Sequence, residues 1–258
     1  MPQIHPSALV SPEASIADDV VIGPFTVIEG PVKLAAGVKV GGHACISGDT
    51  EIGEGCEIGW GAVVGADPQD LSFDRTTRSG VRLGPHNVLR EYVTIHRGAK
   101  NGAYTTMGEK NFLMAGVHLA HDVTMGSHNV LANNVLLGGH VRVGNRTFLG
   151  GGAGFHQFIH VGDFAMVQGN AAVSQDVPPY CICYGQNQLA GLNVVGMRRA
   201  GFDAGARNEI KSAAKLLLFS NIPLTQALEL AARSEWGAPA RALIDAVTSP
   251  SKKGVIVG

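Results

Sequence analysis

Hydrophobic residues recur at every sixth position through most of the first 173 residues of this chain. Every step of six from Ile4 to Val64 meets Ile, Val or Leu, and the rhythm runs again from Leu83 to Ile95 and from Met107 to Val173. A period of six fits neither an amphipathic helix nor a simple alternating strand. It fits short parallel strands that turn a corner every six residues, each with one side chain pointing into a narrow core.

Three such hexads complete one triangular coil of 18 residues, and each coil stacks on the last at a strand spacing of about 4.8 Å. The 26 hexads therefore give between eight and nine coils. The predicted fold is an all-β solenoid, a left-handed parallel β-helix over residues 1–180. The two breaks in the rhythm predict loops near 67–80 and 99–106, and long loops on a regular scaffold often carry function.

The hexad rhythm stops after Pro178 and Pro179, and the sequence becomes rich in Ala and Leu. Helical spacing, as between Ile210, Ala214 and Leu217, predicts helices in this part of the chain. We expect residues 181–258 to form a small C-terminal α-helical domain that caps the open end of the solenoid. The expected helices cover residues 205–219, 224–234 and 238–247.

Composition excludes several classes of protein. The formal net charge is -1, which gives no reason to expect nucleic acid as a partner. Residues 1–179 carry 11 Lys and Arg against 16 Asp and Glu, whereas residues 180–258 carry nine against five, so the C-terminal part is a candidate surface for an acidic partner. The four cysteines lack metal-site spacing, and neither a signal peptide nor an apolar run of membrane-spanning length is recognisable. We expect a cytoplasmic protein that does not insert into membranes.

Several of the ten histidines fall along one edge of the predicted solenoid. Positions 18 apart lie in neighbouring layers, so the segment 120–122 should lie under 138–140, which should lie under 156–158. This register brings His121 next to Gly139, with His140 and His156 in the following layers and His118 one corner earlier. Four other histidines, His5, His43, His86 and His128, are interpreted as ordinary surface residues.

This edge suggests acyl-transfer chemistry. A neutral imidazole at His121 can remove a proton from a hydroxyl that attacks a thioester. Asp122 could orient that imidazole, provided that its side chain reaches the same side of the strand. The backbone N–H of Gly139 is a candidate donor to the oxyanion of the tetrahedral intermediate, and His140 and His156 could bind phosphate or hydroxyl groups.

A zinc site is the alternative chemistry for the same residues. His118 and His121, with His140 from the next coil, could hold a metal as in the carbonic anhydrases that share this solenoid. A third possibility is a binding scaffold that has lost its activity.

Eight motifs distributed over essentially the whole chain resemble the UDP-N-acetylglucosamine 3-O-acyltransferases (LpxA), which carry out the first step of lipid A synthesis. The motifs are PQDL (68–71), VTIHRG (93–98), HLAHD (118–122), LANN (131–134), GGHV (138–141), FHQF (155–158), QDVPPY (175–180) and GLNVVGMRRAGF (191–202).

The resemblance implies a homotrimer with active sites in the clefts between subunits. It implies transfer of a 3-hydroxyacyl chain from acyl carrier protein to the glucosamine 3-hydroxyl of a UDP-sugar, without a metal or a cofactor. His121 matches the general base of the family and Gly139 its oxyanion donor. The residues implied in substrate binding are Gln69 and Asp70 in the first loop, His118, His140 and His156, Gly169 at the end of the acyl groove, and Asn193 and Arg199 near the donor or nucleotide phosphates.

The sequence departs from the family pattern at three positions. Ser72 stands where the family usually has a lysine that contacts the phosphate or the sugar, and Arg75 or Arg78 would have to replace it. Asn187 stands in place of a frequent histidine, and Ala200 in place of an arginine. An N-acyltransferase that acts on a 3-amino UDP-sugar is therefore the alternative within this fold, because an amine is the better nucleophile.

Overall fold

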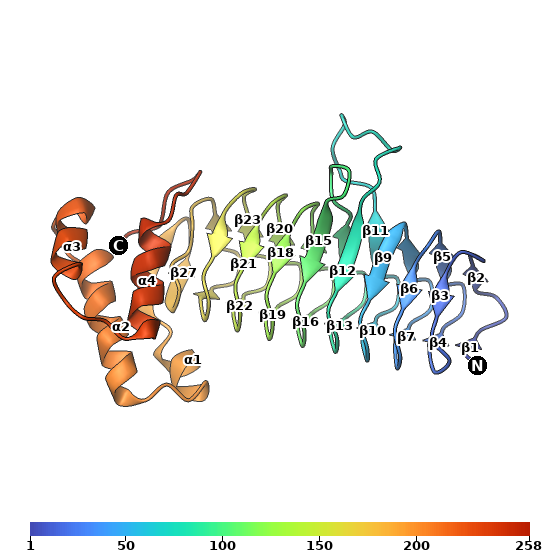
Figure 1. Cartoon of the computed structure of the whole chain (residues 1–258), viewed down its shortest axis with the longest axis horizontal. Coiled ribbons are helices and arrows are strands. Elements are labelled where there is room, and N and C mark those ends of the chain that lie inside the picture. The colour runs from blue at the N-terminus through green and yellow to red at the C-terminus, as the bar shows by residue number, and fades with distance from the viewer.

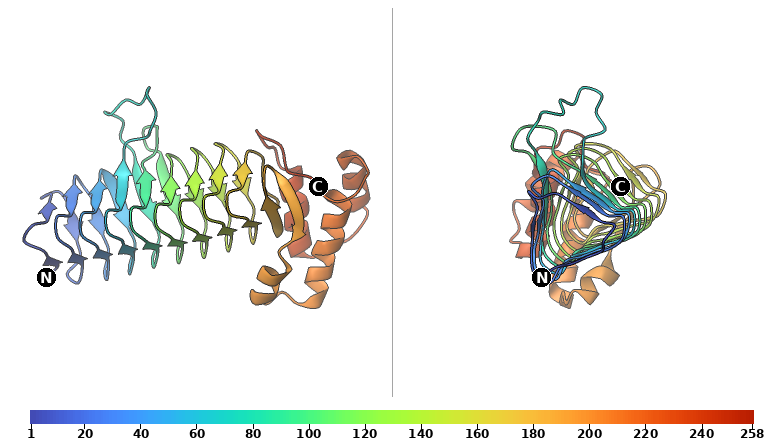
Figure 2. Two further views of the ribbon diagram at one scale, coloured as in Figure 1. Left: turned by 180° about the vertical axis from the view of Figure 1, so that it is seen from behind. Right: turned by 90° about the vertical axis from the view of Figure 1, so that its right-hand side faces the viewer.

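The computed structural model describes residues 1–258 as a straight, three-sided rod with a group of helices at its C-terminal end (Figure 1). The view along the rod shows the triangular outline, with two loops that project from one corner (Figure 2). All strand pairs within the rod are parallel, as the hexad rhythm predicts; the one antiparallel pair joins the last two strands of the chain.

The three faces of the rod are three sheets, here called sheets A, B and C. Sheet A contains β1 (Gln3–Ile4), β4 (Val21–Ile22), β7 (Lys39–Val40), β10 (Glu57–Ile58), β13 (Val88–Leu89), β16 (Phe112–Leu113), β19 (Val130–Leu131), β22 (Phe148–Leu149), β25 (Met166–Val167), β27 (Cys181–Tyr184) and β28 (Gln188–Leu192). Sheet B contains β2 (Leu9–Val10), β5 (Val27–Glu29), β8 (Cys45–Ser47), β11 (Val63–Ala66), β14 (Thr94–His96), β17 (His118–Leu119), β20 (Leu136–Leu137), β23 (Gly154–Phe155) and β26 (Ala172–Val173). Sheet C contains β3 (Ser15–Ile16), β6 (Lys33–Leu34), β9 (Asp49–Ile52), β12 (Gly80–Leu83), β15 (Tyr104–Met107), β18 (Thr124–Met125), β21 (Arg142–Val143) and β24 (His160–Val161).

The hexad side chains form one continuous core inside the rod. From Ile22 onward they are almost fully buried, and a second residue two positions earlier, usually a smaller one such as Val135 before Leu137, is buried beside each of them. Burial of each large aliphatic side chain contributes about 1.5–3 kcal/mol. Only the first coil is open on one side, and there Ile4 remains 40% exposed.

The corners of the rod require a left-handed backbone at one residue in most hexads. This residue lies three positions after the core side chain, and in many coils it is not glycine. At the corner between sheets B and C, the residues with positive φ are Asp122, His140 and Phe158 in successive coils. A left-handed corner residue turns its side chain along the edge of the rod, so these three side chains form a column.

The two loops leave the rod at this same corner. The first covers residues 67–79 between β11 and β12, in agreement with the prediction apart from its last residue. The second covers 97–103, and the prediction of 99–106 was wrong at both ends. Residues 104–106 belong to β15 because the strand begins before its core residue Met107 and pairs with β12 over its whole length.

The helical part contains α1 (Val194–Arg199), α2 (Ala204–Leu217), α3 (Leu224–Ala231) and α4 (Ala238–Thr248). The predicted division at residue 180 places β27 and β28 in the wrong part, because β27 pairs with β25 and extends sheet A. The sequence did not reveal α1. Ile210, Ala214 and Leu217 of α2 are buried, as their spacing predicts. No helix of the chain combines the length and the apolar character needed to cross a bilayer.

Candidate active site

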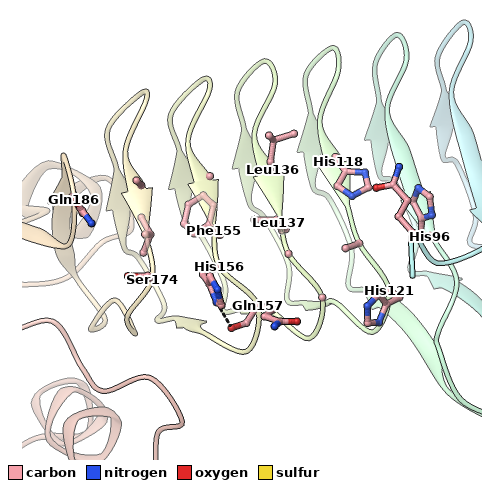
Figure 3. Close-up of a pocket in the computed structure, with 17 residues that line it drawn as sticks. His96, His118, His121, Leu136, Leu137, Phe155, His156, Gln157, Ser174 and Gln186 are labelled. Atoms are coloured by element: carbon pink, nitrogen blue, oxygen red, sulfur yellow. Dashed lines mark hydrogen bonds between the residues drawn. The ribbon is translucent and has the colours of Figure 1, made fainter. Parts of the chain in front are cut away.

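A groove of about 650 Å³ runs along the outer face of sheet B and reaches the corner between sheets B and C (Figure 3). Its floor is a column of outward-facing residues in register, His118, Leu136, Gly154 and Ala172. The full lining is Gln69, His96, His118, Ala120, His121, Leu136, Leu137, Gly138, Gly139, Gly154, Phe155, His156, Gln157, Ala172, Val173, Ser174 and Gln186. The groove floor is therefore apolar beyond His118, and other histidines and amides lie at its rim.

His121 and Asp122 form a hydrogen-bonded pair at the corner. His121 Nδ1 lies 2.8 Å from Asp122 Oδ2, and the two side chains are 19% and 13% exposed. Asp122 has a φ of 59°, so its side chain turns back toward the imidazole instead of pointing to the opposite side of a strand. The same oxygen accepts a bond from the backbone N–H of Ala99 in the second loop. Because a carboxylate only accepts, Nδ1 carries the proton, and in the neutral form of the imidazole the lone pair is on Nε2.

Gly139 lies in the layer next to His121, as the 18-residue register predicts. A β-carbon at this position would lie 2.7 Å from His121 Nε2 and 2.8 Å from Cε1, so only glycine leaves room for the ring. The backbone N–H of Gly139 donates to no group within the chain, whereas those of Gly138 and His140 are bonded. A free N–H beside a basic nitrogen is the arrangement that an oxyanion donor requires.

His140 belongs to the column of corner residues behind this pair. Its ring meets that of His121 edge-on at a centroid distance of 5.1 Å and stacks on Phe158 at 4.6 Å. His121, Asp122 and His140 place ligand atoms within 4.8 Å of one another, but His118 is not part of this cluster. The zinc alternative, which combined His118, His121 and His140, therefore does not match the observed placement.

His118 lies on the groove floor and pairs with residues of the preceding coil. Its Nδ1 is 2.8 Å from the hydroxyl of Thr94, and its ring meets that of His96 at 5.1 Å. Burial, with a smaller contribution from the charge of His96, lowers the pKa of His118 to about 4. His118 is therefore a neutral hydrogen-bonding residue near pH 7.

His156 lies at the rim of the groove, after the core residue Phe155 of β23. Its Nδ1 is 3.2 Å from the carbonyl oxygen of Gln157, and the side chain is exposed (Figure 3). Gln157 lies in the layer next to that of Gly139, on the side of the helical part. Ser174 and Gln186 continue the polar rim in the same direction. The groove thus presents several hydrogen-bonding groups beyond the His121 corner.

The first loop contributes Gln69 to the groove, whereas Asp70 lies beside it and is exposed. Asp70 Oδ1 accepts bonds from both the N–H and the hydroxyl of Ser72, at 2.9 and 2.7 Å. These bonds, the backbone one first, lower the pKa of the Asp70 carboxyl. Ser72 therefore orders the loop but supplies no cation. Neither Arg75, which lies 3.5 Å from Asp67, nor Arg78 lines the groove.

Sequence reasoning missed His96, Gln157, Ser174 and Gln186 as groove residues. The motif VTIHRG contains His96, but the extra residues of the second loop separate its coil from the next by 24 positions instead of 18, as the pairing of Ile95 with Leu119 shows. Counting in steps of 18 therefore does not find it. Gln157 could have been found, because it lies 18 positions after Gly139.

Comparison with known proteins identifies the family. The family model described as "Udp N-acetylglucosamine O-acyltransferase; Domain 2" matches residues 176–256. An acyl-(acyl-carrier-protein)–UDP-N-acetylglucosamine O-acyltransferase from Paraburkholderia phymatum is 40% identical, over 99% of this chain and 100% of that protein. This chain belongs to the UDP-N-acetylglucosamine O-acyltransferase family. The resemblance predicted from the motifs is confirmed.

Solved structures of this acyltransferase family have the same architecture. LpxA from Acinetobacter baumannii superposes with a TM-score of 0.93 at 36% identity and covers 98% of this chain and 99% of its own. The UDP-N-acetylglucosamine acyltransferase from Campylobacter jejuni gives a TM-score of 0.93 at 34% identity over 99% and 100%. The predicted left-handed parallel β-helix with a C-terminal helical part is confirmed.

Asp70 lies beside the groove and His140 behind the His121–Asp122 pair, so neither of these two implied substrate-binding residues lines it. Three further residues that the acyltransferase resemblance implied in substrate binding lie outside the groove of this chain. Gly169 is exposed at the corner between sheets A and B. Asn193 caps α1: its Oδ1 accepts from the N–H of Gly196, and its Nδ2 donates to the carbonyl of Phe164. Arg199 is exposed at the last turn of α1. A single chain therefore does not bring these three residues to His121.

Proposed function

We propose that this chain transfers a 3-hydroxyacyl group from acyl carrier protein to the 3-hydroxyl of UDP-N-acetylglucosamine, the first step of lipid A synthesis. One observation carries the proposal: His121, held through Nδ1 by Asp122, lies against Gly139, whose N–H is free. The name of the Paraburkholderia relative supplies the two substrates. The reaction needs no cofactor, because the thioester is already activated.

The roles of the residues follow from the geometry. As the sugar hydroxyl attacks the thioester carbon, His121 Nε2 takes the hydroxyl proton, and Asp122 stabilises the imidazolium that forms. The Gly139 N–H donates to the developing oxyanion. Collapse of the intermediate breaks the carbon–sulfur bond, and the imidazolium returns its proton to the departing sulfur. The products are the ester and the free thiol of the carrier protein.

The proposed assembly is a homotrimer, supported by the positions of the remaining substrate-binding residues. The groove is open along one side, and Gly169, Asn193 and Arg199 lie outside it in one chain. A neighbouring copy that supplies such residues would complete the site in a cleft between subunits. The charge asymmetry of the chain supports docking of the acidic carrier protein on the basic C-terminal part. Cytoplasmic location stays a prediction.

The test of the proposed function uses 3-hydroxyacyl carrier protein with two acceptors in parallel, UDP-N-acetylglucosamine and its 3-amino analogue. We expect mass spectrometry to detect the 3-O-acyl product when the hydroxyl sugar is the acceptor. Ser72, in place of the family lysine, is the reason to include the amine, since a better nucleophile tolerates weaker positioning. Acylation of the amino sugar alone would contradict the proposal and identify an N-acyltransferase.

Gly154 offers a separate test of where the acyl chain lies. A β-carbon at this floor position would meet nothing within 4 Å, and its φ lies outside the left-handed range, so larger residues should fold normally there. We expect the leucine of Gly154→Leu to fill the groove between Leu136 and Ala172. Forcing a long acyl chain past it should cost about 1–3 kcal/mol, as overpacking of a filled site does, and should therefore lower kcat/KM for long-chain donors about ten-fold or more. Donors with short acyl chains should lose less. Equal kcat/KM values for wild type and variant with every donor would place the acyl chain elsewhere.

A further inference from the structure

A second hollow lies on the other side of the catalytic corner, on the outer face of sheet C. It has a volume of about 520 Å³. Asp122 and His140 form its wall toward the active site, while the C-terminal tail covers its far side. The complete lining is Lys100, Asp122, Thr124, His140, Arg142, Phe158, His160, Asp176, Pro250, Ser251 and Lys252. None of the groove residues contributes to this hollow.

Three cations from separate parts of the chain converge on this hollow. Lys100 comes from the second loop, Arg142 from β21 and Lys252 from the C-terminal tail. None of them has a carboxylate oxygen within 4.0 Å, whereas the cations of the sheet C face nearer the N-terminus, such as Lys33 and Arg82, are ion-paired. Like charges held together without counter-ions repel one another, so a bound anion would stabilise the hollow.

The two carboxylates in the lining form no ion pair with these three cations. Asp122 accepts bonds from His121 and from the N–H of Ala99. Asp176 is buried, and its Oδ1 accepts a 2.8 Å bond from the N–H of His160. The field of the cations reaches His140: burial is the largest cause of its lowered pKa, Asp122 opposes the shift, and His121, Lys252 and Lys100 add to it.

The aromatic ring in the lining is not available for stacking. Phe158 is parallel to His140 at a centroid distance of 4.6 Å, and the ammonium of Lys252 lies 4.3 Å from its centroid. The ring of Phe158 is therefore already in contact with two groups of the chain, which disfavours stacking of a nucleobase on it. The remaining lining is polar and unsuited to an acyl chain. A compact, strongly charged anion fits these constraints best.

The tail that carries Lys252 is held against the rod. Asp176 exchanges backbone bonds with Gly254 and Ile256, and the side chain of Ile256 is buried in the core. Lys252 is therefore positioned a few residues from a fixed point, which lowers the entropy cost of recruiting it to a ligand.

We propose that this hollow is a binding site for a phosphate-type oxyanion, held by Arg142 with Lys100 and Lys252 beside the catalytic pair. The guanidinium can donate two parallel hydrogen bonds to one phosphate, and the two ammonium groups supply point charges from either side. The anion would neutralise the cluster and connect the second loop and the tail to sheet C. The same chemistry is offered by free phosphate or pyrophosphate and by the diphosphate of a sugar nucleotide.

Isothermal titration of the full chain with pyrophosphate, at constant ionic strength, tests this site. We expect saturable binding at one site per chain and a loss of affinity of about ten-fold or more in Lys252→Gln, because one charge-assisted hydrogen bond is removed. Lys253→Gln is the matched control, since it makes the same charge change one residue away and outside the hollow. That variant should bind within about two-fold of wild type.

A second titration in the presence of saturating UDP-N-acetylglucosamine distinguishes the two sources. Unchanged affinity for pyrophosphate assigns the site to a free anion, whereas competition assigns it to the phosphates of the nucleotide; either result supports the site. Absence of saturable binding at millimolar pyrophosphate, or equal affinities of wild type, Lys252→Gln and a Lys100→Gln/Arg142→Gln double variant, would overturn it. Thermal unfolding of each variant verifies that the fold is intact.

Discussion

Replacement of His121 by alanine is expected to lower kcat for acyl transfer by about a hundred- to ten-thousand-fold, the usual contribution of a positioned general base. The reason is specific to this site. The imidazole of His121 is hydrogen-bonded through Nδ1 to the Asp122 carboxylate, and it lies beside the free N–H of Gly139. His118, the nearest substitute on the groove floor, has its Nδ1 bonded to Thr94. Its pKa of about 4 also makes it a weak base.

The measurement is the steady-state rate with 3-hydroxyacyl carrier protein and saturating sugar nucleotide. The His121 side chain is at the surface of the rod and not in the core, so the unfolding temperature should change by no more than about 2 °C, as for other surface substitutions. His128→Ala is a suitable control, because His128 lies at another corner of the rod and outside the groove. A His121→Ala variant that kept more than a tenth of the wild-type rate would remove His121 as the base.

Gly139→Ala is expected to lower kcat about a hundred-fold, since a misplacement of about 1 Å at a reacting group can have this effect. The added methyl would lie 2.7 Å from His121 Nε2, and the imidazole would have to leave the position in which Asp122 holds it. The φ of Gly139 is not in the left-handed range, so alanine should not strain the backbone itself. The loss should therefore appear in kcat with little change in the unfolding temperature.

Gly154→Ala provides the comparison for this substitution. It adds the same methyl group to the same groove, but at a position where nothing lies within 4 Å. We expect it to keep most of the wild-type rate. If Gly139→Ala and Gly154→Ala had equal, near-normal rates, the contact between Gly139 and the His121 ring would have no part in the reaction. A parallel pH–rate profile should show whether the remaining Gly139→Ala activity still depends on a single base.

Much of this arrangement was predictable because the repeat itself sets the geometry. Once the hexad is recognised, each layer follows by adding 18 to a residue number, and this placed Gly139 beside His121. The pairing of Asp122 with His121 did not follow, since neighbouring residues of a strand point to opposite sides. It depends on the left-handed backbone at Asp122, and hydrophobic periodicity carries no information about that angle.

Other features depend on where the repeat is interrupted or ends. The start of β15 was misplaced because Tyr104–Met107 pairs with β12 for two residues more than a regular hexad strand would. The strands β27 and β28 lie beyond the last hexad, and the short helix α1 is defined by the cap at Asn193 more than by its composition. The hollow beside sheet C could not be predicted at all, because it needs the tail to return to Asp176.

The position of the paired histidine and aspartate on an edge gives the two sides of the rod separate tasks. His121 opens onto the groove of sheet B, while Asp122 borders the hollow of sheet C. Selection can therefore retune the basicity of the catalytic imidazole through substitutions in the hollow behind it, without changing the groove in which the acyl transfer takes place. Homologues with one and the same substrate pocket would then differ in their working pH according to the charges carried behind it.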